Sequence, residues 1–226
     1  MRLADSSWPA LACAPRRVLA VPLGATEQHG PHLSLTVDTE IAVELCERLA
    51  AARPAVVSAP AVPYGSSGEH AGFAGTLSIG RQATELLLVE LGRSADTFAG
   101  VLFVSAHGGN AIPLRRAVAL LREEGRKVLA WAPAGSPADS HAGDRETSVM
   151  LALHPDAVDM TRAEPGNVHP LPELMDRLRT SGVRGVSPNG VLGDPTGATA
   201  ATGARVLARW QTDLLAAFDR WVTTLP

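Results

Sequence analysis

Lysine is nearly absent from this 226-residue chain, which carries it only as Lys127. The Lys and Arg residues form no basic run, which a nucleic-acid-binding surface would need, so we expect no nucleic-acid partner. The apolar runs fall far short of the roughly 20 residues of a membrane helix. The first residues also lack the charged start and long apolar stretch of a signal peptide. We therefore expect a soluble, cytoplasmic protein with no membrane partner.

Cysteine and aromatic residues are scarce as well. Cys13 and Cys46 are too few for a disulfide framework and lie in no C-x-x-C motif, so we expect reduced thiols. Aromatic residues make up 4% of the chain, which predicts a core of Ala, Val and Leu. A chain of this length can bury such a core without disulfides. We expect one domain spanning residues 1–226.

Short β-branched runs alternate with longer helical patterns along the chain. Residues 65–80 are rich in Gly and Ser and predict a long loop, which is often functional. Residues 155–194 predict an irregular segment with one short helix near Leu174. The alternation predicts an α/β fold with a mostly parallel sheet covered by helices on both faces. The predicted strands are 18–23, 56–59, 101–105 and 127–132, and the predicted helices are 39–53, 82–98, 113–124, 145–153 and 198–222.

The first polar cluster, Glu27-Gln28-His29, follows the first predicted strand. Residues two apart in an extended segment point to the same side, so Glu27 and His29 can converge on one ion. Asp38 precedes the next helix, and carboxylate and imidazole ligands together suit Zn, Fe(II) or Mn. A helix N-cap is the alternative role for Asp38.

Two more clusters follow strands of the predicted sheet. His107-Gly-Gly-Asn110 comes between a strand and a helix, where the glycines permit close approach to a ligand. A phosphate-binding loop or a plain turn is the alternative, although no P-loop Lys follows. In the segment HAGDRET, Glu146 falls in the first turn of a helix, where favourable interaction with the helix dipole is the alternative role. His141 has no obvious structural role in its Gly-rich loop. All the clusters lie where parallel sheets form binding sites, beyond the carboxyl ends of strands.

Four segments resemble the creatininase family of metal-dependent amidohydrolases: VPLGATEQHGPHLSLTVDTEIA, EHAGFAGTLSIG, VSAHGGN and HAGDRETS. The resemblance covers nearly the whole chain. It implies a three-layer αβα sandwich, a homo-oligomer (a hexamer in this family) and one or two divalent ions per subunit, Zn or Fe(II) with Mn possible. The metal ligands that it implies are Glu27, His29, Asp38, His107 and Glu146.

One position departs from creatininase itself, which carries a Glu two residues after the ligand His, where this chain has Gly109. This departure argues against creatinine as the substrate and against a fully occupied second metal site. The tail VSPNGVLGDPTGATAATGARVLARW, the start LADSSWPAL and the loop YGSSGEH are similar to the peptidase branch that acts in the mycofactocin system. That resemblance implies release of a C-terminal Val-Tyr-derived dipeptide from a modified precursor peptide.

These observations predict a hydrolase of amide or peptide bonds that uses a metal-activated water. We expect Glu146 and Asp38 to be catalytic, and His141 to stabilise the oxyanion or pass a proton to the leaving amine. Three alternatives remain: hydrolysis of a cyclic amide such as creatinine, hydrolysis of a formamide such as a formamidopyrimidine, and a non-catalytic flavodoxin-like binding module. The expected substrate-binding residues are Glu69, His70, Ser78 and Asn110, with a solvated loop tip as the alternative for the first two.

Overall fold

A four-stranded parallel sheet with the order β2-β1-β3-β4 forms the centre of the computed structural model, which describes residues 1–13 and 15–225. β1 and β3 pair over six residues, from Val18 opposite Gly100 to Leu23 opposite Ser105. The two central strands therefore end side by side, and the residues that follow them start from neighbouring points. The strands are β1 (Val18–Leu23), β2 (Val56–Ser58), β3 (Gly100–Ser105) and β4 (Val128–Trp131).

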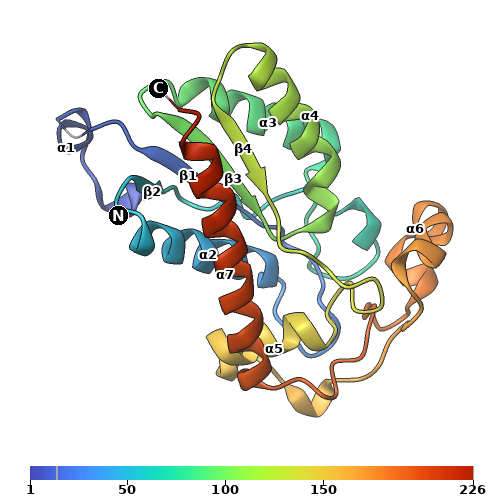
Figure 1. Cartoon of the computed structure of the whole chain (residues 1–226). Coiled ribbons are helices and arrows are strands. Elements are labelled where there is room, and N and C mark those ends of the chain that lie inside the picture. Colours follow the sequence, from blue (N-terminus) through green and yellow to red (C-terminus); the bar gives the residue numbers. More distant parts are fainter. Residues whose placement is uncertain (14, 226) are drawn as a thin grey trace.

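Helices cover both faces of this sheet (Figure 1). Side chains alternate along each strand, so Ala20 and Leu102 pack with one group of helices, while Val21 and Phe103 pack with the other. The resulting three layers confirm the predicted αβα sandwich. One face carries α2 (Val37–Ala52), α5 (Asp144–Leu153) and α7 (Ala200–Val222), and the other carries α3 (Gly80–Ser94) and α4 (Ala111–Glu123).

The segment predicted to be irregular contains a longer helix than expected, α6 (Leu171–Val186), which stands apart from the sheet in Figure 1. Gly182 kinks this helix with a φ of 65°. A Cβ on Gly182 would lie 2.8 Å from the carbonyl oxygen of Glu69, so glycine allows α6 to approach the 3₁₀ turn Gly68–His70 closely. The residues around this glycine have low helix propensity, so the sequence did not predict the full helix. Packing of α6 against the 3₁₀ turn supports the helix instead.

Other boundaries differ from the predictions in smaller ways. The helix predicted over 82–98 ends at Ser94, and the following residues turn into β3. The short N-terminal helix α1 (Trp8–Ala12) was not predicted. None of the described helices is both long enough and apolar enough to cross a bilayer. The remaining elements are the 3₁₀ helices Leu3–Asp5, Gly108–Asn110, Pro155–Ala157 and Met160–Arg162.

Candidate metal centre

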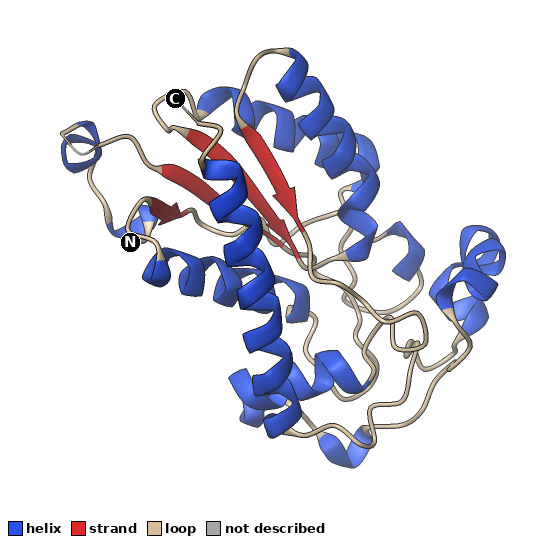
Figure 2. Cartoon of the chain, viewed as in Figure 1, coloured by secondary structure: helices blue, strands red, loops and turns tan. Residues whose placement is uncertain are grey.

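The five predicted ligands come together beyond the carboxyl ends of the strands, where loops gather in Figure 2. Glu27 and His29 lie in the loop after β1, and Asp38 and Glu146 lie in the first turns of α2 and α5. His107 lies two residues after the end of β3. Asp38 links the two sides of the cluster, because its Oδ1 lies 3.4 Å from His29 Nε2 and its Oδ2 lies 3.3 Å from His107 Nδ1.

Both of these histidines are oriented by the backbone. His29 donates from Nδ1 to the carbonyl oxygen of Glu27 at 3.1 Å, and His107 donates from Nε2 to the carbonyl oxygen of Ser66 at 3.0 Å. The opposite ring nitrogen of each imidazole therefore faces the carboxylates, with His107 Nδ1 3.2 Å from Glu27 Oε1. Metal-binding histidines are typically held in this way, because the outer hydrogen bond fixes both the tautomer and the ring orientation.

Several buried polar atoms in the cluster lack partners. Both carboxylate oxygens of Glu27, His29 Nε2 and Asp38 Oδ2 have no hydrogen-bond partner among the described residues. Leaving buried polar atoms unpaired is costly, and native proteins seldom do so without a bound ion, a water or a functional reason. A divalent cation would satisfy these atoms together, since carboxylates and imidazoles are its usual ligands.

The electrostatics of the cluster also fit a cation. Burial alone would lower the pKa of His29, but the carboxylates of Asp38, Glu146 and Glu27 outweigh burial and raise it to about 9. The pKa of His107 is raised well above its ordinary value for the same reason, mainly by Glu27 and Asp38 against burial. The carboxylates thus attract positive charge, either as protons on the imidazoles or as a metal ion.

The ligand atoms form two overlapping sets that share one residue. Glu27, Asp38 and His107 make one set, and His29, Asp38 and Glu146 make the other, with the ligand atoms of each set within 4.8 Å of one another. Asp38 belongs to both, so its carboxylate would be shared if each set held an ion. A third set of Glu27, His29 and His141 overlaps the first two.

The alternative of an N-cap for Asp38 is wrong, because Thr36 occupies the cap of α2. The Asp38 side chain is buried and lies against the two ligand histidines, which lower its pKa below the ordinary range although burial opposes this. Glu146 does contribute to the start of its helix, since its Oε2 accepts a hydrogen bond from the Ala142 amide at 2.6 Å. The same oxygen lies 3.9 Å from His29 Nε2, so the structural role and a ligand role are compatible.

His141 is buried and held in place, although its sequence context suggested only a Gly-rich loop. Its backbone pairs with Leu192, and its Nε2 donates to the carbonyl oxygen of Gln28 at 2.8 Å. The other ring nitrogen, Nδ1, lies 3.9 Å from Glu27 Oε1 and faces the cluster. Burial lowers the pKa of His141 well below its ordinary value, and because Nε2 donates to the Gln28 carbonyl, the lone pair of Nδ1 faces the cluster.

Sequence reasoning gave no role to Gln28, whose neighbours in the chain point the other way. Its Nε2 contacts His70 Nδ1 at 2.9 Å and the carbonyl oxygen of Gly190 at 3.1 Å. His70 Nε2 in turn lies 3.3 Å from Glu27 Oε1, and burial lowers the pKa of His70 to about 4. Gln28 therefore fixes the ring of a neutral His70 beside the Glu27 carboxylate. Strand alternation was the signal, because it directs residue 28 away from residues 27 and 29.

Gly109 stands where creatininase has a carboxylate, and the structure shows what fills that space. A Cβ on Gly109 would overlap Glu69 Oε1, the carbonyl oxygen of Ser66 and His107 Nε2. Glu69 therefore brings a carboxylate from the long loop to the edge of the cluster, and burial raises its pKa above the ordinary range. No side chain at position 109 fits this arrangement.

The remaining two predicted substrate-binding residues make hydrogen bonds within the loops. Asn110 is buried, accepts from the Ser66 amide at 3.0 Å and donates to the carbonyl oxygen of Gly24 at 3.0 Å. Ser78 Oγ accepts from the Ser67 amide at 2.9 Å. Neither lines the cavities beside the cluster, so their observed contacts support positioning of the loops, and their binding of substrate stays a prediction.

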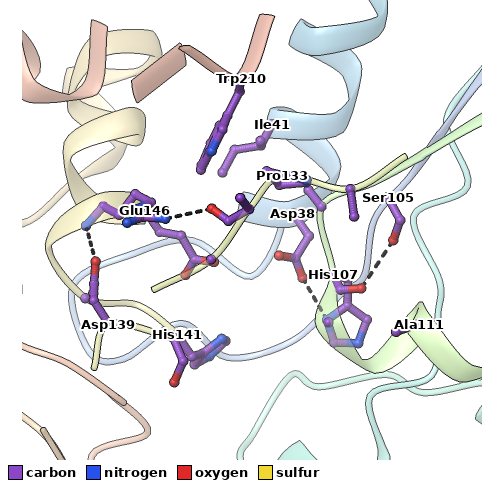
Figure 3. Close-up of a pocket in the computed structure, with 18 of the residues that line it drawn as sticks. Asp38, Ile41, Ser105, His107, Ala111, Pro133, Asp139, His141, Glu146 and Trp210 are labelled. Carbon is purple, nitrogen blue, oxygen red and sulfur yellow. Dashed lines mark hydrogen bonds and ion pairs between the residues drawn. The ribbon is translucent and has the colours of Figure 1, made fainter. Parts of the chain in front are cut away.

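Two cavities meet at the cluster. One, of about 280 Å³, is shown in Figure 3, where Asp38, His107, His141 and Glu146 surround a space bounded on another side by Trp210. The other, of about 270 Å³, opens between the 3₁₀ turn Gly68–His70 and α6. Both cavities are lined by His107 and His141, so a substrate can approach the cluster from two sides and extend past it.

Known proteins with similar sequences fall into two groups. The mycofactocin precursor peptide peptidase of Mycolicibacterium smegmatis is 51% identical over 212 residues, covering 90% of this chain and 85% of the relative. The protein of the same name from Mycobacterium ulcerans is 46% identical over 226 residues, covering 96% and 87%. The creatinine amidohydrolase of Pseudomonas putida is 31% identical over 178 residues, covering 64% and 67%.

Solved structures and a family model point the same way. A crystal structure of creatinine amidohydrolase superposes with a TM-score of 0.79 at 25% identity, covering 97% of this chain and 96% of the other. A creatininase described as its Mn form gives a TM-score of 0.80 at 23% identity, covering 97% of each. The family model named creatininase, creatinine amidohydrolase, matches residues 4–218. The chain therefore belongs to the creatininase family.

Proposed function

We propose that this protein is a metal-dependent peptidase that releases a C-terminal Val-Tyr-derived dipeptide from the modified mycofactocin precursor peptide. The observation that carries the proposal is the buried carboxylate and imidazole cluster between two cavities, which can hold the scissile bond of a chain extending on both sides. The relatives named as mycofactocin precursor peptide peptidases, at 46% and 51% identity, support this substrate class. A cytoplasmic location and a hexamer stay predictions.

We infer that the cluster holds one or two divalent ions, with Asp38 shared if both are present. Zn, Fe(II) and Mn all accept this ligand set, and solved creatininases are described as Mn and Zn-Zn forms. When bound, such a metal polarises a carbonyl and lowers the pKa of water toward about 7. The ligands Glu27, His29, His107 and Glu146 would set its position in the site.

The protein's own residues supply the proton transfers. His141 keeps its Nε2 proton on the Gln28 carbonyl, so its Nδ1 can take a proton and pass it to the leaving amine. The Glu69 carboxylate lies beside His107 at the cavity wall, close enough to contact a substrate there. Gln28 holds the His70 ring, whose Nε2 lies 3.3 Å from Glu27 Oε1.

Creatinine hydrolysis fits the site less well than peptide hydrolysis. Two adjoining cavities of about 280 and 270 Å³ exceed the needs of a small cyclic amide, and the carboxylate that creatininase carries is replaced here by Gly109. The test is to incubate the metal-loaded protein with the modified precursor peptide, with creatinine and with a formamidopyrimidine, and to weigh the products. Release of the dipeptide from the peptide alone supports the proposal, whereas turnover of creatinine alone contradicts it.

A further inference from the structure

The cavity between the 3₁₀ turn and α6 continues into a longer groove. The part next to the metal ligands, about 270 Å³, adjoins a second cavity of about 480 Å³. Both are lined by Glu69, Arg81, Leu178 and Arg179, so they form one passage leading away from the cluster. An extended peptide, whose successive residues advance by about 3.3 Å, can lie along such a passage.

Two arginines face this passage from opposite elements. Arg81 lies in the first turn of α3 and has no hydrogen bond or ion pair among the described residues. Arg179 lies on α6, and its ion pair with Asp176 at 3.2 Å joins side chains that are 68% and 97% exposed. A pair so exposed contributes little, so the Arg179 guanidinium remains available to a ligand.

Two guanidinium groups, those of Arg81 and Arg179, line this groove together with the carboxylate of Glu69. Basic side chains therefore outnumber the one carboxylate that lines both parts of the passage. The guanidinium group matches a carboxylate geometrically, because its planar donors can form two parallel hydrogen bonds with the two oxygens. The wall between the arginines and the cluster is apolar on the α6 side, where Met175, Leu178 and Val183 lie.

We propose that Arg81 and Arg179 together bind a carboxylate of the peptide substrate and so set its register in the groove. The inference rests on the proposed peptidase function. The carboxylate can come from an acidic side chain of the precursor peptide or from its C-terminus. The chemistry of recognition is the same for both sources.

The test measures KM and kcat for the modified precursor peptide with wild-type protein and with the double variant Arg81→Gln, Arg179→Gln. We expect KM to rise about tenfold, because two individually weak, exposed ion pairs are lost together, while kcat and bound metal stay unchanged. Arg115→Gln is the matched control, because Arg115 is exposed on α4 and lines neither cavity. Its KM should equal that of the wild type.

Two altered peptides identify the source of the carboxylate, one with an amidated C-terminus and one with its acidic side chains replaced by amides. The peptide that lacks the bound carboxylate should show a high KM with wild-type protein and no further rise with the double variant. An unchanged KM for the double variant on the unaltered peptide overturns the inference, as does a rise that persists on a peptide lacking all carboxylates. Failure of wild-type protein to cleave any peptide overturns the proposed function itself, and the inference with it.

Discussion

Asp38 is the residue on which the metal centre depends most, and Asp38→Asn is the sharpest perturbation of it. The substitution keeps the size of the side chain but removes the charge shared by both ligand sets. In the metal-free protein the pKa of His29 is raised from 6.5 to about 9, with Asp38 the largest of the contributions that raise it. A shift of that size corresponds to about 3 kcal/mol of favourable interaction with the imidazolium form.

Removing this charge should have two measurable effects. Without Asp38, burial should dominate, and the pKa of His29 in the metal-free protein should fall back to its ordinary value or below. Metal affinity should fall by more than 100-fold, because losing only an outer-shell partner already costs about 10–100-fold. Turnover should be lost with the metal, while the fold persists.

The assay combines bound metal per chain after equilibration in a metal buffer, turnover of the peptide, and an NMR titration of the histidines. Glu40→Gln is the control, since Glu40 lies in the same helical turn but contacts Thr36 and His154 instead of the ligands. If Asp38→Asn kept both its bound metal and its turnover, the reasoning would be refuted.

Three further predictions address other parts of the site. His141→Ala should keep its metal and lose turnover by about 10²–10⁴-fold, whereas His107→Ala should lose both; metal loss in His141→Ala would show that this residue is a ligand instead. Metal binding to metal-free protein at pH 7 should release a proton from His29, whose pKa of about 9 keeps it protonated there, so affinity should rise with pH between about 7 and 9. Calorimetry in buffers of different ionisation enthalpy measures that proton, and pH-independent affinity would contradict the prediction. Gly182→Ala should raise KM and leave bound metal unchanged, because a Cβ there meets the Glu69 carbonyl oxygen and displaces α6; an unchanged KM would show that the position of α6 does not matter.

The sheet and the place of the carboxylate and imidazole cluster were predictable from sequence because the signals are local. The run at 18–23 is apolar throughout and became β1 with the predicted bounds. Glu27 and His107 follow neighbouring strands, so parallel topology alone brings them together. The location of these residues follows from the fold, and their roles as metal ligands stay predictions.

What could not be predicted depends on contacts between distant segments. The helix α6 contains Gly182, which disfavours helix locally, and it forms against the turn that carries Glu69. The role of Gln28 depends on His70 and Gly190, which lie 42 and 162 residues away in sequence. The groove with its two arginines likewise exists only once α3 and α6 are placed.

The central claim is that the carboxylate and imidazole cluster binds a divalent metal that peptide cleavage requires. The most direct measurement strips the protein with a chelator, adds Zn, Fe(II) or Mn stepwise, and follows cleavage of the modified precursor peptide at each step by mass spectrometry. We predict that stripped protein is inactive and that activity rises to a plateau at one or two ions per chain. Full cleavage by metal-free protein in the presence of chelator would contradict the claim.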